Sequence, residues 1–339
     1  MNKELLETTA QAMVVKGKGI LAMDESTGTC VKRFVKYGIE CTFETRRVYR
    51  SLLLTTPNLS DYIAGAILYD ETIRQQVAGS HLPMPAYMAA HGIIPGIKVD
   101  MGAKPLAGHP GQVVTEGLDG LRERLAEYRE LGARFAKWRA VINIGEGLPT
   151  QAGIEANAHA LARYAALVQE AGLVPIVEPE VLMDGNHTIE RCYEVTAVTL
   201  QAVFAALFQQ GVYLEGMVLK PSMVISGKEC PQRAAPEQVA AETVRCLRDH
   251  VPAAVPGIAF LSGGQSSAEA TWHLSLMNQL GGVPWALSFS YGRALQQEAL
   301  ETWHGSDANI PAAQAAFRQR ASLVAAAATG QYTPEMENS

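Results

Sequence analysis

The chain has 339 residues, of which 48% are hydrophobic and 18% charged, a composition typical of a globular protein with a large buried core. The net charge of −6 is mild and no run of Lys or Arg occurs, so we expect no nucleic acid and no membrane as a partner. Five scattered cysteines, with no signal peptide and no run of about 18 apolar residues, favour a reduced, cytoplasmic setting.

The first part of the chain alternates short apolar segments with longer amphipathic ones. Short apolar runs predict strands, and apolar residues at helical spacing predict helices. Ser26 is the predicted N-cap of the helix that follows the first strand. We predict strands over 17–23, 63–69, 93–99 and 135–142, with helices over 3–15, 32–37, 43–56 and 118–131.

The second part continues the same alternation without a linker or a repeat. We predict strands over 173–178, 213–219, 257–261 and 285–289, with helices over 153–171, 187–210, 236–249 and 266–280 and two more to about 328. Eight strands alternating with helices favour a parallel (β/α)8 TIM barrel over two doubly wound domains. We therefore expect a single domain over residues 1–332 and a short, polar, mobile tail over 333–339.

Ionisable residues stand at the predicted strand ends, where the active site of such a barrel lies. Lys220 ends the sixth strand just before a proline, and we predict that it is a nucleophile. A second cation such as Lys137 would lower its pKa, and Glu178 could exchange protons with an adduct on the amine. These parts suit Schiff-base chemistry. The alternatives are a snorkelling lysine and a purely structural network of ion pairs.

Two glycine-containing loops follow the last two predicted strands, at residues 261–265 and 290–293. Backbone N–H groups and helix N-termini there could hold a phosphate, and barrel phosphate sites often follow strands seven and eight. Lys32 and Arg33 could meet a second phosphate. The alternatives are ordinary turns for the loops and a solvated helix face for the two cations.

The sequence lacks the phosphate-binding Walker motif, the dinucleotide-binding glycine motif and a zinc-protease motif. The cysteines and histidines do not stand at metal-ligand spacings. We therefore expect no metal and no cofactor.

The motifs resemble those of class I fructose-bisphosphate aldolases. They occur in order along the chain and are Gly17-Lys-Gly-Ile-Leu-Ala-Met-Asp-Glu-Ser-Thr27, Gly96-Ile-Lys-Val-Asp100, Lys137-Trp-Arg139, Ile176-Val-Glu-Pro-Glu180, Val218-Leu-Lys-Pro221, Leu261-Ser-Gly-Gly-Gln265 and Ser290-Tyr-Gly-Arg293. The resemblance implies a metal-independent enzyme, usually a homotetramer. Such an enzyme reversibly cleaves the sugar fructose 1,6-bisphosphate into dihydroxyacetone phosphate and glyceraldehyde 3-phosphate.

The resemblance also implies roles for single residues. Lys220 matches the Schiff-base lysine, Glu178 the acid and base that dehydrates its adduct, and Asp24 the base that takes the C4 hydroxyl proton. Lys137, with Glu180 beside it, matches a residue that assists the imine chemistry and positions the substrate. The expected substrate-binding residues are Ser262, Gly263, Ser290, Gly292 and Arg293 for the ketone-side phosphate, Ser26, Thr29, Arg33 and Lys98 for the aldehyde-side phosphate, and Arg139.

Two features depart from the family pattern. Many relatives end in a tyrosine that helps to protonate the enamine, whereas this sequence ends Glu335-Met-Glu-Asn-Ser339 and its Tyr332 matches an earlier position. We expect another donor or water to protonate the enamine. Thr29 replaces a serine and keeps the hydroxyl. A transaldolase or a deoxyribose-phosphate aldolase is the alternative enzyme, and a non-catalytic scaffold is the alternative from another class.

Overall fold

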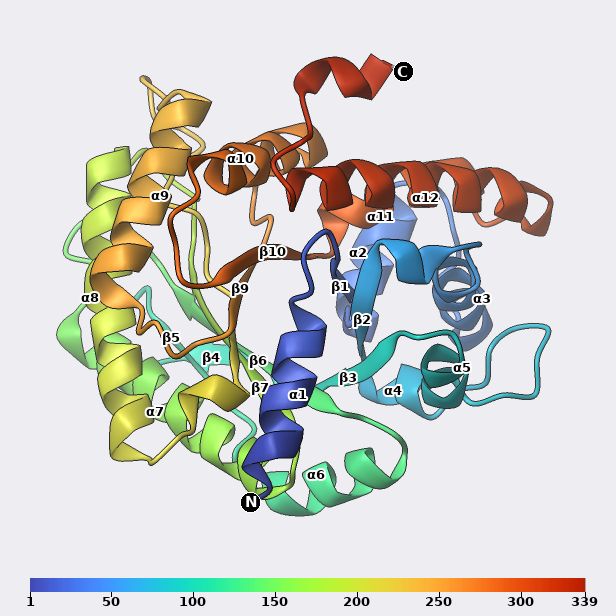
Figure 1. Cartoon of the computed structure of the whole chain (residues 1–339), viewed down its shortest axis with the longest axis horizontal. Helices are drawn as coiled ribbons and strands as arrows, with labels where there is room; N and C mark the ends of the chain where they lie inside the picture. Colours follow the sequence, from blue (N-terminus) through green and yellow to red (C-terminus); the bar gives the residue numbers. More distant parts are fainter. Residues whose placement is uncertain (339) are drawn as a thin grey trace.

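Eight parallel strands form a closed barrel in the computed structural model, which describes residues 1–338 (Figure 1). Their order around the barrel follows the chain, and the last strand pairs with the first. This topology confirms the predicted (β/α)8 TIM barrel. The barrel strands are β1 (Gly19–Ala22), β2 (Ile63–Leu68), β3 (Ile94–Lys98), β6 (Phe135–Ile142), β7 (Val174–Val181), β8 (Val218–Leu219), β9 (Gly257–Phe260) and β10 (Ala286–Tyr291).

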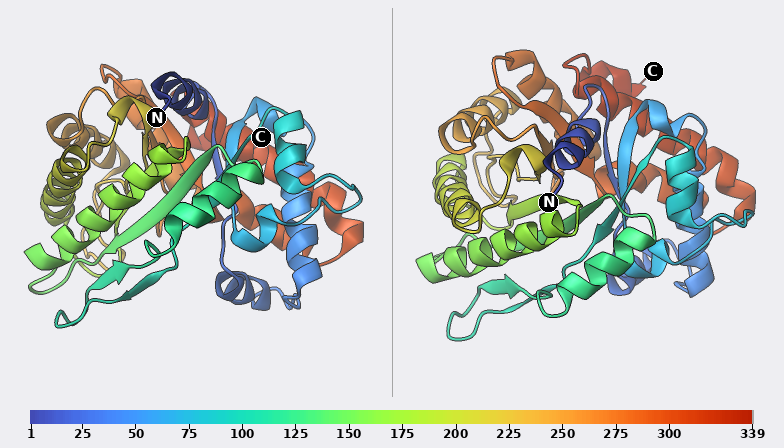
Figure 2. Two further views of the ribbon diagram at one scale, coloured as in Figure 1. Left: turned by 90° about the horizontal axis from the view of Figure 1, so that it is seen from below. Right: turned by 60° about the horizontal axis from the view of Figure 1, so that its bottom comes forward.

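Helices surround the strands and cover their outer face (Figures 1 and 2). They are α1 (Lys3–Met13), α2 (Thr27–Val35), α3 (Phe43–Leu54), α4 (Asp70–Ile73), α5 (Met84–Ala90), α6 (Leu121–Glu130), α7 (Gln151–Glu170), α8 (Ile189–Gln209), α9 (Pro236–His250), α10 (Ser267–Leu280), α11 (Arg293–Trp303) and α12 (Ile310–Ala327). Short 3-10 helices are η1 (Leu59–Asp61), η2 (Leu214–Gly216), η3 (Asp307–Asn309) and η4 (Pro334–Asn338). Ser26 is the N-cap of α2, as predicted, and its hydroxyl accepts a hydrogen bond from the Thr29 N–H.

The hydrophobic core has two parts. The larger part lies between the barrel and its helices. The smaller part joins the inside of the barrel to α1, whose Leu6, Ala10 and Met13 pack with Phe135 of β6 and Val174 of β7. Because Val174 begins its strand, α1 covers the amino-terminal end of the barrel and leaves the carboxyl end for the ionisable residues.

A β-hairpin interrupts the connection between β3 and α6 and was not predicted. Its strands β4 (Ala103–Pro105) and β5 (Val113–Thr115) are antiparallel, and β5 packs against β6 and α7 (Figure 2). The predicted strand over 213–219 is wrong in its first half, because residues 214–216 form η2 and only Val218 and Leu219 pair as β8. Lys220 therefore follows a very short strand.

Residues 334–338, within the predicted polar tail, form η4 and are attached to the helices. The Glu337 carboxylate accepts two hydrogen bonds from the Arg320 guanidinium, at 2.7 and 2.6 Å, and one from the Tyr332 hydroxyl at 2.6 Å. The Tyr332 side chain is fully buried. These contacts give the segment a defined position against α12.

Helix α8 is long and apolar enough to cross a membrane by length and composition alone. Half of its most apolar window is buried, and it packs against β7, α7 and α9 as one of the barrel helices. Its hydropathy is therefore that of a core helix.

The barrel interior predicts one stability difference between two glycines. A Cβ atom at Gly96 of β3 would lie 2.2 Å from the Phe135 ring, whereas a Cβ at Gly28 of α2 would meet no atom within 4 Å. We expect Gly96→Ala to lower the free energy of unfolding by about 1–3 kcal/mol through overpacking. Gly28→Ala, the matched control, is expected to leave it unchanged or raise it by up to about 1 kcal/mol. Chemical denaturation of both variants measures the difference, and equal midpoints would contradict this account of the interior.

Candidate active site

A cleft of about 950 Å³ opens at the carboxyl ends of the barrel strands. Fifteen of the predicted site residues line it, from β3, β6, β7, β10, α2 and α11 and from the segments that follow β1, β8, β9 and β10. These residues are Asp24, Ser26, Thr29, Arg33, Lys98, Lys137, Arg139, Glu178, Glu180, Lys220, Ser262, Gly263, Ser290, Gly292 and Arg293. The barrel thus brings together residues that are far apart in the sequence. Lys32, predicted with Arg33 as a possible phosphate contact, is exposed and does not line the cleft.

A second cleft of about 720 Å³ lies beside the carboxyl ends of α6 and α7 and contains none of these residues. Its arginines are engaged locally: Arg129 donates to the Ala171 carbonyl, and Arg122 pairs with Glu170. Arginines that bind helix-end carbonyls stabilise the helix termini. The candidate catalytic and binding residues therefore lie in the cleft at the strand ends.

Lys220 lies at the base of this cleft, immediately after β8. Its backbone N–H donates to the Val177 carbonyl at 2.8 Å, which continues the pairing with β7 for one residue. Its side chain is buried, and its Nζ lies 3.4 Å from Oε1 of Glu178. Burial lowers the pKa of the Lys220 amine below its usual value, the Glu178 carboxylate opposes this shift, and the cation of Lys137 adds to it.

Lys137 of β6 is the cation at the centre of the cluster. Its Nζ lies 2.9 Å from Oδ2 of Asp24 and 3.1 Å from Oε2 of Glu178. Burial acts to lower the pKa of Lys137, but Asp24 and Glu178 outweigh burial and raise it above its usual value. Glu178 therefore has one carboxylate oxygen beside each lysine, and the pKa values of the two amines are shifted in opposite directions.

Asp24, just beyond β1, is the carboxylate on the other side of Lys137. Burial alone would raise the pKa of Asp24, but Lys137 and Lys220 lower it to about 2. The side chain is consequently ionised throughout the neutral range. An ionised, buried carboxylate facing a cleft can accept a proton from a bound hydroxyl group.

Arg139 and Glu180 form a second ion pair in the cleft. Each lies two residues nearer the carboxyl end of its strand than Lys137 and Glu178. Residues two apart on a strand point to the same side, so β6 and β7 each direct two charged side chains into the cleft. Burial opposes ionisation, but Glu180 holds the pKa of Arg139 above its ordinary value. Lys137 and Arg139 accordingly both line the cleft.

The loops after β9 and β10 form one side of the cleft. Gly263 has a φ of +58°, a conformation that favours glycine, and Gly292 is the N-cap of α11. The Nη2 group of Arg293 donates to the Gly263 and Gln265 carbonyls, at 3.1 and 2.9 Å, and joins the two loops. The hydroxyl of Ser290 is buried and makes no hydrogen bond within residues 1–338. These donors converge where an anion could bind.

The cations on the opposite side of the cleft are paired with acids. Arg33 Nη1 lies 2.5 Å from Oε1 of Glu25, and Lys98 Nζ lies 2.7 Å from Oδ1 of Asp100. Asp100 also accepts hydrogen bonds from the Arg139 and Gly102 N–H groups, at 3.3 and 3.2 Å. A phosphate at this side must compete with the two carboxylates for the cations.

Glu25 and Asp100 line the cleft and pair with two of its cations, and the sequence did not single them out. Both belong to the quoted motifs, but neither was given a role. Their positions could have indicated that they lie in the cleft, because Glu25 follows Asp24 and Asp100 lies two residues after Lys98. Within residues 1–338, His, Cys, Asp and Glu side chains form no group of three or more that could hold a metal ion.

Comparisons with known proteins agree on one family. A family model described as fructose-bisphosphate aldolase class-I matches residues 4–339. A probable fructose-bisphosphate aldolase class 1 of Xanthomonas campestris is 63% identical over 98% of this chain and 99% of its own length. A cytosolic fructose-bisphosphate aldolase of Arabidopsis thaliana is 52% identical, over 93% of this chain and 80% of its own.

A solved structure is similar over nearly the whole fold. It is fructose-bisphosphate aldolase from Plasmodium falciparum in complex with TRAP and a small-molecule inhibitor. The two chains superpose with a TM-score of 0.96 and 49% sequence identity, over 97% of this chain and 95% of the other.

The charge cluster predicts how Lys220 responds to its neighbour. Lys137→Met removes the cation that lowers the pKa of Lys220 and leaves Asp24 and Glu178 beside it, so the pKa should rise. Because only the neutral amine reacts, labelling of Lys220 by an amine-specific reagent at pH 7 should become slower.

Peptide mapping by mass spectrometry over a range of pH values measures that rate. Lys228 serves as the internal control, since its side chain is 44% exposed and pairs with Asp184 rather than with the cluster. Faster labelling of Lys220 in the variant would contradict the assignment of Lys137 as the cation that lowers its pKa.

Proposed function

Because the chain belongs to the class I fructose-bisphosphate aldolase family, we propose that it cleaves fructose 1,6-bisphosphate through an imine on Lys220. The observation that carries the proposal is the position of Glu178, between a lysine of lowered pKa and a lysine of raised pKa. Burial favours the neutral form of the Lys220 amine, and the adjacent carboxylate can accept and donate a proton. The protein is a lyase of this family, and its reaction places it in glycolysis, gluconeogenesis or the Calvin cycle.

Imine formation uses Lys220 and Glu178. The Lys220 Nζ attacks the C2 carbonyl carbon of the ketose, and the π electron pair of the C=O bond moves to the oxygen. The Glu178 carboxylate takes one proton from the nitrogen, and the oxygen takes up one from solvent, which gives a carbinolamine. Glu178 then donates a proton to the departing hydroxyl group, which leaves as water and produces the protonated imine. Lys137, which hydrogen-bonds Asp24 and pairs with Glu178, keeps both carboxylates in place.

Carbon–carbon cleavage uses Asp24. The Asp24 carboxylate takes the proton from the C4 hydroxyl, the C4–O bond becomes a carbonyl, and the C3–C4 bond breaks. The electron pair of that bond moves to C3 and is accepted by the protonated imine, which becomes an enamine. Glyceraldehyde 3-phosphate leaves, the enamine takes up a proton at C3, and water hydrolyses the imine to release dihydroxyacetone phosphate.

The two phosphates bind at opposite sides of the cleft. We assign the ketone-side phosphate to the loops after β9 and β10, where Arg293 and two helix N-termini supply cation and N–H donors. We assign the aldehyde-side phosphate to Ser26, Thr29, Arg33 and Lys98 on the other side. Arg139 and Glu180 line the cleft beside the chain of the sugar.

The protein acts on a small sugar bisphosphate, and we expect it to be a cytoplasmic homotetramer. The cytoplasmic assignment is supported by the cytosolic aldolase of Arabidopsis thaliana, which is 52% identical. The tetramer follows from the family resemblance.

Trapping tests the covalent step. In excess chelator, borohydride reduction of the protein with dihydroxyacetone phosphate should leave a stable adduct on Lys220, since reduction traps an imine. Mass spectrometry of the peptides locates it, and Lys220→Arg should abolish it while the protein stays folded. A folded wild-type protein without an adduct would refute the imine mechanism.

Substrates with one phosphate test the two binding sides. Arg33→Met should lower kcat/KM for fructose 1,6-bisphosphate by about 10- to 100-fold, the value of one charge-assisted hydrogen bond. It should leave cleavage of fructose 1-phosphate nearly unchanged, because that sugar lacks the aldehyde-side phosphate. Arg293→Met should reduce both. Equal losses with both substrates in Arg33→Met would contradict the assignment.

A further inference from the structure

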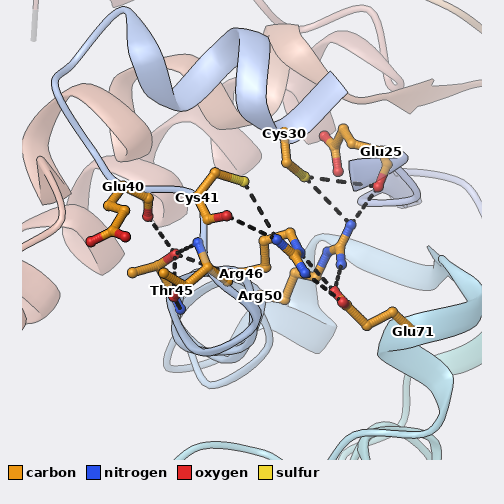
Figure 3. Close-up of polar contacts among 9 residues, drawn as sticks. Glu25, Cys30, Glu40, Cys41, Thr45, Arg46, Arg50 and Glu71 are labelled. Carbon is orange, nitrogen blue, oxygen red and sulfur yellow. Dashed lines mark hydrogen bonds and ion pairs between the residues drawn. The ribbon is translucent and has the colours of Figure 1, made fainter. Parts of the chain in front are cut away.

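Two arginines of α3 converge on one carboxylate outside the cleft. Arg46 and Arg50 lie one turn apart, are 7% and 1% exposed, and both pair with Glu71 of α4 (Figure 3). Arg46 binds both carboxylate oxygens, at 2.8 and 2.6 Å, whereas Arg50 reaches only Oε1 at 3.4 Å. A buried guanidinium with one long ion pair needs further acceptors.

The further acceptor of Arg50 is the backbone of the segment between β1 and α2. Its Nη2 donates to the Glu25 carbonyl at 2.5 Å, and the Cys30 thiol lies 3.8 Å from the same oxygen. Figure 3 shows the Arg50 guanidinium between Glu71 on one side and Glu25 on the other. The strong hydrogen bond to this peptide group therefore comes from a charged, fully buried side chain.

The Glu25 peptide lies between two residues of the cleft. Asp24 precedes it and Ser26 follows it, and the Glu25 carboxylate pairs with Arg33. Arg50 itself is not among the residues that line the cleft. The Asp24 carboxylate is held by Lys137 on one side, and the position of its backbone depends on the next peptide group. Arg50 reaches the cleft through this segment by a hydrogen bond, and otherwise through the Tyr69 ring, whose centroid lies 5.9 Å from its guanidinium.

We propose that Arg50 is a positioning residue for carbon–carbon cleavage, which holds the Glu25 carbonyl and thereby the Asp24 carboxylate in register with the substrate. This inference rests on the proposed function, in which Asp24 is the base. A planar guanidinium suits the task because separate N–H groups reach the Glu71 carboxylate and the Glu25 carbonyl at once. A lysine has one nitrogen and a shorter reach.

The competing account gives Arg50 a purely structural role between α3 and α4. Arg46 offers a matched control, because it lies on the same helix, is also buried and pairs more closely with the same Glu71. Its remaining contacts are to Cys41, outside the segment that carries Asp24. A structural role predicts equal effects from the two positions.

The experiment compares Arg50→Lys with Arg46→Lys, both of which keep a positive charge beside Glu71. For each folded variant we measure kcat for cleavage and the fraction of Lys220 trapped as the reduced adduct with dihydroxyacetone phosphate. Trapping needs Lys220 and Glu178 but no bond cleavage. We expect Arg50→Lys to lower kcat by about 10- to 100-fold, the cost of a misplaced catalytic group, and to leave trapping unchanged. Arg46→Lys should change neither.

A second variant covers the case in which Arg50→Lys does not fold. Glu71→Gln keeps Arg50 but weakens its anchor, so kcat should fall by a smaller factor while trapping stays constant. Unchanged kcat in either folded variant, or a parallel loss of cleavage and trapping, would overturn the inference. Failure of the proposed function is a separate outcome, since the wild-type protein would then show no adduct at all.

Discussion

The structure depends on the balance of buried charge at the carboxyl end of the barrel. Two lysines and two carboxylates, Lys137, Lys220, Asp24 and Glu178, lie there almost without exposure to solvent. Burying any one of them alone would cost several kcal/mol. Together the four groups offset one another's cost of burial, since Lys137 lies between the two carboxylates. Lys220 is the lysine whose charged form is disfavoured. The same electrostatics shift the pKa values of the two lysines in opposite directions, a pattern typical of functional sites.

The same balance of charge extends to the side of the cleft that we propose for a phosphate. In the free protein Arg33 and Lys98 are held by Glu25 and Asp100, so these cations have defined positions before any ligand arrives. An incoming phosphate exchanges one anionic partner for another. This arrangement limits the gain in affinity from each cation but avoids leaving an unpaired charge in a partly buried site.

Much of the fold and of the candidate site could be predicted from the sequence because both depend on local pattern. Strand and helix periodicity predicted the barrel, and positions at the ends of predicted strands indicated Lys220, Glu178 and Asp24 as candidate site residues. The hairpin of β4 and β5 was missed because its strands are three residues long and carry no clear alternation. The pairing of Arg50 with the Glu25 carbonyl joins positions 25 residues apart through a backbone acceptor, and no side-chain pattern records such an acceptor.

Helix α1 has a consequence for the electric field in the barrel. Its apolar side chains and those of the barrel interior form a layer of low polarisability beneath the charged cluster. Field lines from the cluster are weakly screened on that side and spread toward the open cleft, where water and ligands can respond to them. A helix that contributes no residue to the cleft thus gives the field of the cluster a direction, because that field acts mainly toward the open side where a ligand enters.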